Sequence, residues 1–417
     1  MYVLLILALF LLAFCMIAAR LSTSMLTAPM IFLALGTLLA ELDLVPLSGA
    51  EAALHTVAEV ALIVLLFLDA AQIDQKALLK RNVWPARMLA IGLPLAFLFG
   101  IAVGLIALPG WPFAAVALVA AILVPTDAAL GQPVVSNMDV PERPRRALTV
   151  ESGLNDGLAL PLVLLVASFA ATDSIAPSDG WLLFAIKQIT LGPLVGVALG
   201  FVGGQVLLLA KRHRTTSDIY EGIGALALAA AAYLAAIEVG GNGFIAAFAA
   251  GLGFGAVVRG QCAFVYEFTE SEGQLLSWAA FFLLGATLVP EAAKHLTVET
   301  GLLILANLLV VRPLAIWIAM TGSDASAPTR LFFGWFGPRG LATALFALLV
   351  VDQLDHGRGE EVLHIAINAV WISAILHGLT AAPGAKLYAR LMRHREMEAE
   401  MAPVEHSTDA FRERMQT

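Results

Sequence analysis

One short polar segment inside an apolar stretch holds residues whose types and spacing could do chemistry: Glu151-Ser152-Gly153-Leu154-Asn155-Asp156. On a helix, Ser152 and Asp156 share one stripe because they are four residues apart, and Glu151 and Asn155 share the neighbouring stripe. Hydroxyl and carboxylate oxygens can replace the hydration shell of a monovalent cation. A carboxylate that holds either a proton or a cation cannot carry both at once. Asp156 is therefore the first candidate for a shared cation and proton site.

Two Pro/Gly interruptions lie in apolar stretches that otherwise read as helices. The first is Leu123-Val124-Pro125-Thr126-Asp127-Ala128, where proline removes a backbone donor and clashes with the preceding turn. The second is Gly334-Trp335-Phe336-Gly337-Pro338-Arg339-Gly340. We expect both helices to break. Asp127 lies beside the freed carbonyls of residues 123–126, so it either helps to bind a cation or neutralises the ends of the half-helices.

Buried charges are the next signal, because each costs roughly 3 kcal/mol inside a membrane span and so implies a function or a partner. Arg339 needs a counter-charge, and Glu151 is the natural candidate for a structural ion pair. Glu59 and Glu238 lie nearer span ends and are interpreted as snorkelling or interface residues. Arg312 receives no assignment. The histidines His55, His364 and His377 are interpreted as packing or rim residues.

Composition identifies the elements that must position these residues. The chain is 60% hydrophobic and only 13% charged, where soluble domains are about one quarter charged, and its mean hydropathy is +0.86. Apolar runs of about twenty residues suit helices that cross a hydrocarbon core of roughly 30 Å. The strands of a transmembrane barrel would show alternating polarity, and such segments are absent from this sequence. No pattern typical of nucleic-acid binding appears either. Two cysteines argue for neither a disulfide framework nor a metal cluster. We expect an all-α polytopic membrane protein without a cofactor.

Apolar windows predict about thirteen spans, and an interfacial helix could precede the tenth, between 259 and 273. Their limits are 2–19, 26–41, 54–73, 84–107, 112–132, 147–171, 181–210, 219–238, 242–258, 275–289, 299–320, 331–351 and 361–386. The two interruptions are seven spans apart, so they enter the membrane in opposite directions, as inverted repeats with two crossed discontinuous helices require. A substrate site is expected near the midplane, where the breaks meet.

Orientation follows from the basic residues of the short loops. Loops after odd-numbered spans hold nearly all of them, while loops after even-numbered spans hold only Lys294 and Arg358. The positive-inside rule then places the N-terminus outside and the C-terminus in the cytoplasm. The last stretch, about 396–417, is polar and predicts a flexible tail. The run 2–19 reads as a retained span rather than a signal peptide.

Four motifs together resemble the monovalent cation:proton antiporter family, specifically its electroneutral NhaP-like sodium/proton exchangers. They are Pro125-Thr126-Asp127, Glu151-Ser152-Gly153-Leu154-Asn155-Asp156-Gly157, Asn242-Gly243-Phe244-Ile245-Ala246-Ala247-Phe248 and Gly337-Pro338-Arg339-Gly340. The resemblance implies a homodimer that works by an elevator-type mechanism. It also divides the exchanger domain, 1–391, into a core (about 84–171 and 299–386), a dimerisation part (about 2–73 and 219–289) and a linker helix (about 181–210), followed by a short tail, 392–417.

The resemblance also implies roles for individual residues. Asp156 would bind the cation with Ser152, the Thr126 carbonyl and Asp127, and Asp69 in the third span would contribute. Glu151 and Arg339 would form a buried salt bridge, and Asn155 would stabilise the core. Because the electrogenic branch of the superfamily carries Asp-Asp, Asn155-Asp156 implies one proton per cation with no net charge moved.

The sequence thus predicts an antiporter of Na⁺ or Li⁺, with K⁺ also open, and H⁺ in the cell (plasma or inner) membrane, serving pH homeostasis. One alternative is an intramembrane aspartyl protease using Asp127 and Asp156 from adjacent spans, although no Gly-x-Gly-Asp motif is present. Another is a channel or a symporter of the same fold. Ion choice depends on sub-ångström oxygen placement, which the sequence does not specify.

Overall fold

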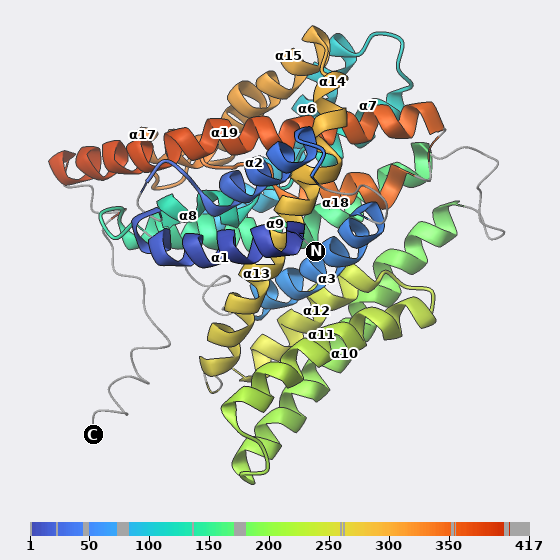
Figure 1. Cartoon of the computed structure of the whole chain (residues 1–417), viewed down its shortest axis with the longest axis vertical. Coiled ribbons are helices and arrows are strands. Elements are labelled where there is room, and N and C mark those ends of the chain that lie inside the picture. Colours follow the sequence, from blue (N-terminus) through green and yellow to red (C-terminus); the bar gives the residue numbers. More distant parts are fainter. Residues whose placement is uncertain are drawn as a thin grey trace.

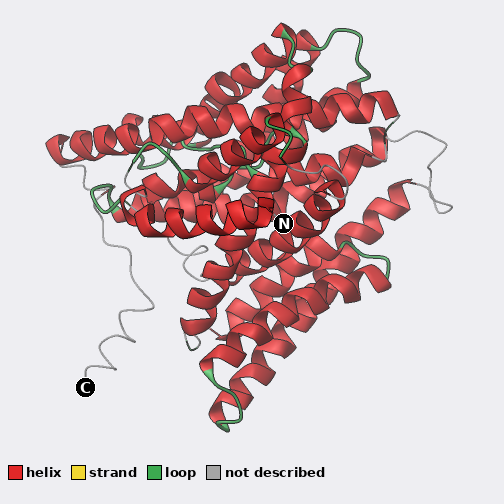
Figure 2. Cartoon of the chain, in the orientation of Figure 1, coloured by secondary structure: helices red, strands yellow, loops and turns green. Residues whose placement is uncertain are grey.

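A computed structural model describes residues 2–21, 24–44, 50–72, 83–135, 137–170, 181–258, 261, 263–351, 354, 356–395 and 400. Helices carry nearly all of this part of the chain, and Figure 2 draws no strand in it. Helix formation follows from the composition, because long apolar segments in lipid must satisfy their backbone hydrogen bonds internally.

Twenty helical segments follow one another in the described part of the chain. They are α1 (Tyr2–Leu21), α2 (Ala28–Glu41), α3 (Ala50–Ala71), α5 (Val83–Arg87), the π-helical η1 (Met88–Gly92), α6 (Leu93–Ala107), α7 (Phe113–Ile122), α8 (Ala128–Val135), α9 (Glu142–Ala170), α10 (Trp181–Arg212), α11 (Asp218–Glu238), α12 (Gly243–Val258), α13 (Ala263–Thr287), α14 (Val289–Lys294), α15 (Val298–Ala306), the π-helical η3 (Asn307–Val311), α16 (Arg312–Ala319), α17 (Ala327–Trp335), α18 (Leu341–Val350) and α19 (His356–Arg395).

Each predicted span coincides with one described helix or with consecutive helices, so the all-α, polytopic prediction is confirmed. Within the described residues, seven helices are long and apolar enough to cross a membrane, and five shorter apolar helices accompany them. The expected interfacial helix before the tenth span is wrong, because α13 runs unbroken from Ala263 to Thr287. The last helix continues to Arg395, beyond the predicted span, and the tail expected at 396–417 lies outside the described residues except for Glu400.

Both predicted breaks are present. One interrupted element is α7 and α8, which end and begin at Ile122 and Ala128; the other is α17 and α18, which end and begin at Trp335 and Leu341. The two breaks meet directly, since the Asp127 amide donates to the Pro338 carbonyl at 2.8 Å. A backbone hydrogen bond therefore joins the two breaks, as the predicted crossing requires.

Helices outside the crossing pack through glycines. A Cβ on Gly200 of α10 would lie 2.0 Å from the Ala250 carbonyl oxygen of α12, and one on Gly251 of α12 would lie 2.1 Å from the Phe67 carbonyl oxygen of α3. Figure 1 shows α10, α11 and α12 running side by side. Because lipid gives no hydrophobic drive for helix association, close backbone approach and van der Waals contact hold such helices together.

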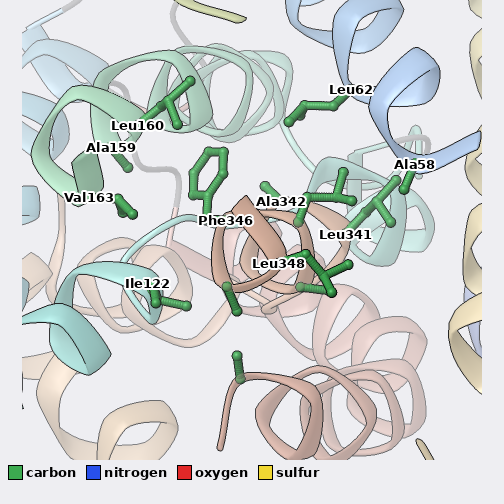
Figure 3. Packing of buried hydrophobic residues seen from close by; sticks show 14 of the residues in the cluster. Ala58, Leu62, Ile122, Ala159, Leu160, Val163, Leu341, Ala342, Phe346 and Leu348 are labelled. Carbon is green, nitrogen blue, oxygen red and sulfur yellow. The ribbon is translucent and has the colours of Figure 1, made fainter. Parts of the chain in front are cut away.

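The short helix α18 is buried in the middle of the molecule. It contacts α3, α7, α9, α13 and α19. In Figure 3, its Phe346 points toward Leu160 and Val163 of α9, and its Leu341 lies on the side of Ala58. These residues are almost fully buried. A buried helix that packs against five others is a fixed support for the break at its N-terminus.

Candidate functional site

The middle of α9 contacts the break between α7 and α8 through side-chain hydrogen bonds. Ser152 Oγ donates to the Thr126 carbonyl at 2.9 Å. Asn155 Nδ2 donates to Thr126 Oγ1 and to Glu151 Oε1, both at 3.1 Å. All four side chains are buried. Asn155 thus holds the unwound segment against α9.

Asp156 lies one turn beyond Ser152 on the same stripe of α9. Its Oδ1 is buried and accepts no hydrogen bond from any residue that the structure describes. Buried carboxylate oxygens nearly always have a partner, so this one requires an explanation. Asp69 of α3 lies close to Gly153, and its Cβ is 3.2 Å from the position that a Cβ on Gly153 would take. Glycine at 153 therefore allows a second carboxylate to come close to Asp156.

The expected pairing of Glu151 with Arg339 is wrong. Glu151 pairs with Arg312 through two hydrogen bonds, Nη1 to Oε1 at 3.1 Å and Nη2 to Oε2 at 3.2 Å. Both side chains are almost fully buried. This bidentate geometry is the strongest arrangement that a guanidinium and a carboxylate can form. The residue left without an assignment by the sequence thus neutralises the buried glutamate.

Arg339 instead contacts backbone carbonyls of the first break. Its Nη1 donates to the Val124 carbonyl and, at 3.0 Å, to the Pro125 carbonyl, and its Nη2 donates to Asn307 Oδ1 at 2.9 Å. These carbonyls follow the C-terminal end of α7, where the helix dipole favours a positive charge. The Arg339 guanidinium of the second break therefore satisfies backbone carbonyls of the first break.

The reciprocal contact comes from Asp127, whose Oδ2 accepts from the Leu341 amide at 2.8 Å. Leu341 is the first residue of α18, so the carboxylate lies at the positive end of that helix. A Cβ on Gly340 would lie 1.8 Å from the same oxygen, which explains glycine at this position. Asp127 thus occupies the position expected of a residue that neutralises a half-helix end.

Two π-helical segments, η1 and η3, occupy the fourth and eleventh predicted spans, seven spans apart like the breaks themselves. The second one decides which residues face the site. Asn307 and Arg312 are five residues apart, about 140° round an α-helix. A π-turn absorbs one extra residue, which brings both side chains to the same side, one on Arg339 and the other on Glu151.

Sequence reasoning therefore missed Asn307, Arg312 and Ser373, which accepts from the Arg339 amide at 2.7 Å. The available signal was an Asn and an Arg inside one apolar run, since polar groups at that depth need partners. Glu59, interpreted as a snorkelling or interface residue, is half-buried and accepts a hydrogen bond from Tyr233. Glu238 lies exposed at the end of α11, as expected of a residue at a span end.

A small cavity lies beside the breaks. Near the breaks it is lined by Thr126, Asp127, Glu151 and Ser152. Its outer part shares Val135 and Thr149 with a recess at the start of α9 that is also lined by Met138, Glu142, Arg145 and Arg146. Positions 145, 149, 152 and 156 lie along one stripe of α9. Thr149 and Ser152 of this stripe line the cavity, and Asp156 lies one turn beyond Ser152.

A family model described as "Sodium/hydrogen exchanger, transmembrane" matches residues 5–386, nearly the whole chain. This protein belongs to the sodium/hydrogen exchanger family. The match covers both breaks and every residue of the site. It gives no support to the intramembrane protease, because proteins of this family are secondary transporters and not enzymes.

Curated relatives are antiporters by name. The chain is 27% identical over 345 residues to the K(+)/H(+) antiporter NhaP2 of Shewanella sp. (strain ANA-3), a match that covers 80% of this chain and 57% of that protein. It is also 27% identical over 318 residues to the Na(+)/H(+) antiporter 2 of Zygosaccharomyces rouxii, covering 66% of this chain and 38% of that protein. The matched part of the chain thus spans little more than half the length of the Shewanella relative and well under half the length of the Zygosaccharomyces relative.

Solved structures show the same fold. A map of the sodium proton antiporter MjNhaP1 from Methanocaldococcus jannaschii superposes with a TM-score of 0.75 at 21% identity, covering 94% of this chain and 97% of that one. A structure of the same protein at pH 8 gives 0.71 at 21% identity, covering 87% and 91%. The predicted sodium/proton antiporter-like fold is therefore confirmed.

Proposed function

We propose that this protein exchanges a monovalent cation, Na⁺, Li⁺ or K⁺, for H⁺ across the membrane, with Asp156 as the shared site. The observation that supports this proposal best is the buried, unpartnered Oδ1 of Asp156 beside the break at Thr126. The family match and the names of the relatives point in the same direction. A proton on that oxygen or a cation against it would satisfy the carboxylate, and the two compete for one place.

The neighbouring oxygens suit the cation form. Ser152 Oγ uses its hydrogen on the Thr126 carbonyl, which leaves the lone pairs of the hydroxyl for a cation. A carbonyl oxygen has two lone pairs, so the Thr126 oxygen can accept from Ser152 and also bind a cation. We infer that Asp156, Ser152 and the Thr126 carbonyl are the ligands. Asp127 and Asp69 add negative charge, with one oxygen of Asp127 committed to α18.

The charge balance supports an electroneutral exchange of one proton for one cation. Glu151 is neutralised by Arg312, so its charge belongs to the scaffold. Asn155 is an amide and cannot take up a second proton. Asp156 then alternates between two neutral states, protonated or paired with a cation. In this proposal the core, about 84–171 and 299–386, moves as an elevator within a homodimer in the cell membrane, with the N-terminus outside.

Proteoliposomes with an imposed pH gradient test this function. Wild-type protein should dissipate the gradient on addition of Na⁺, Li⁺ or K⁺, at a rate that does not change when the membrane potential is clamped. Asp156→Asn should abolish dissipation because an amide carries neither a proton nor a cation. Glu238→Gln is the matched control, since it removes an exposed carboxylate at the end of α11, and it should behave like wild type. Dissipation by Asp156→Asn at the wild-type rate would refute the assignment.

A further inference from the structure

The C-terminal end of α17 lies deep inside the core, where the Trp335 carbonyl accepts from the Gly337 amide at 3.0 Å and keeps a second lone pair. No water is available in hydrocarbon to meet that lone pair. His377 of α19 meets it, with Nε2 at 3.0 Å from the Trp335 carbonyl oxygen. A carbonyl can only accept, so this contact is a hydrogen bond in the tautomer that carries the ring hydrogen on Nε2, and in that tautomer Nδ1 can only accept. His377 is 2% exposed, and its ring also packs near the Trp335 ring.

The other ring nitrogen faces Ser373, one turn earlier on α19. Nδ1 lies 3.0 Å from Ser373 Oγ and 3.1 Å from the Ser373 carbonyl oxygen. Ser373 Oγ already accepts from the Arg339 amide, so its own hydrogen can be donated to Nδ1. Trp335, His377, Ser373 and Arg339 thus form one hydrogen-bonded chain that connects the two sides of the break between α17 and α18.

This chain ends at the residue that contacts the first break. Ser373 holds the backbone of Arg339, and the Arg339 guanidinium contacts the Val124 and Pro125 carbonyls, directly before Thr126. We propose that His377 is a positioning residue for the cation site: through Ser373 it fixes Arg339, and Arg339 fixes the direction of the Thr126 carbonyl. The inference rests on the proposed function and concerns affinity for the cation rather than the exchange chemistry.

Exchange rates measured against cation concentration at one fixed pH give the test. His377→Leu should raise the KM for the cation about tenfold, the effect of losing one buried hydrogen-bonded link, and change the maximal rate less than about twofold. Ser373→Ala should raise the KM similarly. The double variant should be no worse than either single variant, because all three break the same chain.

Two further variants separate positioning from folding. His377→Gln keeps an amide donor that can reach the Trp335 carbonyl, so it should recover part of the lost affinity and fold even if the leucine variant does not. His364→Leu is the matched control, because His364 is on the same helix and stacks on His295 instead. Its KM should equal that of wild type.

The possible failures are distinguishable. A KM equal to wild type in the folded His377 and Ser373 variants, while Asp156→Asn is inactive, would overturn the positioning role and leave the proposed function intact. A maximal rate that falls while the KM stays constant would also overturn it. If wild-type protein exchanges none of the three cations, both the proposed function and this inference fail.

Discussion

The two helix breaks have the same form, since each lies between two half-helices, but they expose opposite kinds of backbone group. The break between α7 and α8 presents backbone carbonyls, which Arg339 and Ser152 meet. The break between α17 and α18 presents the amide end of a helix, which Asp127 meets. Each break therefore supplies the charged side chain that the other needs. Crossing is a condition for either break to be stable, because neither has water to satisfy it.

The difference between them indicates where a cation belongs. At the first break the Thr126 carbonyl lies next to the Asp156 stripe of α9. At the second break a guanidinium fills the corresponding space, since a Cβ on Gly337 would lie 1.6 Å from Arg312 Nε. One break thus offers oxygens beside a carboxylate, and the other holds positive charge. The first is the candidate site and the second is its support.

The largest effect on stability is expected at the buried ion pair between Glu151 and Arg312. Glu151→Gln leaves the buried Arg312 without its counter-charge and should cost about 3–5 kcal/mol of unfolding free energy. Thermal unfolding of the purified protein in detergent, followed by tryptophan fluorescence, measures the loss. Combining Glu151→Gln with Arg312→Gln should recover part of it, because no lone charge then remains. Recovery with Arg339→Gln instead would show that the pair is assigned wrongly.

A smaller effect is expected at Asp127 and sharpens the distinction between support and site. Asp127→Ala removes the acceptor for the Leu341 amide and should cost about 1–2 kcal/mol. Asp127→Asn keeps an acceptor and should cost less than about 1 kcal/mol, while the lost charge lowers the apparent affinity for the cation. The same unfolding assay and the exchange KM measure the two quantities. An alanine variant as stable as wild type would contradict the capping role.

The smallest effect is expected at Asp324, which joins the two repeats outside the breaks. Its carboxylate accepts from Trp84 Nε1 at 2.6 Å and from Arg143 Nη1 at 2.7 Å. Partial burial raises the pKa of Asp324, but the hydrogen bonds from Arg143 and Trp84 outweigh it and hold the pKa below its ordinary value. A depressed pKa gives stability that is present above about pH 4 and is lost as the pH falls through the folded pKa.

Asp324→Asn should therefore lower stability by less than about 1 kcal/mol at neutral pH and weaken its acid dependence. Unfolding midpoints from pH 3 to pH 7 measure both effects, and the exchange KM should stay at the wild-type value. A variant that changes the KM while its unfolding midpoint is unchanged would show that this pair acts on the site and is more than a surface contact.

Local signals explain what could be predicted from the sequence. Apolar length placed the helices, and Pro125 and Pro338 placed the breaks, because a missing backbone donor acts within one turn. The four-residue spacing of Ser152 and Asp156 placed both on one stripe of α9. The family motifs identified the fold that the superposition confirms. The homodimer, the elevator motion and the division into core and dimerisation parts stay predictions.

Pairings between distant segments depended on how neighbouring helices are rotated. Either of two buried guanidiniums, those of Arg312 and Arg339, could have neutralised Glu151, and no local sequence feature identifies Arg312 as the partner. The π-turn η3 turned Asn307 and Arg312 to one side, a change of one residue that helical periodicity does not foresee. His377 looked like a packing residue because its partners, Trp335 and Ser373, converge on it only in the folded core.

By itself, then, the sequence determined the helices, the two breaks and the stripe that carries Asp156, since each depends on residues within a few turns of one another. Only the tertiary structure decided which charge neutralises which. That choice rests on the close approach of groups far apart in the chain, such as Asp127 Oδ2 and the Leu341 amide at 2.8 Å. Buried charges are stable only in such pairs, so the crossing of the breaks and the identity of the partners are set together.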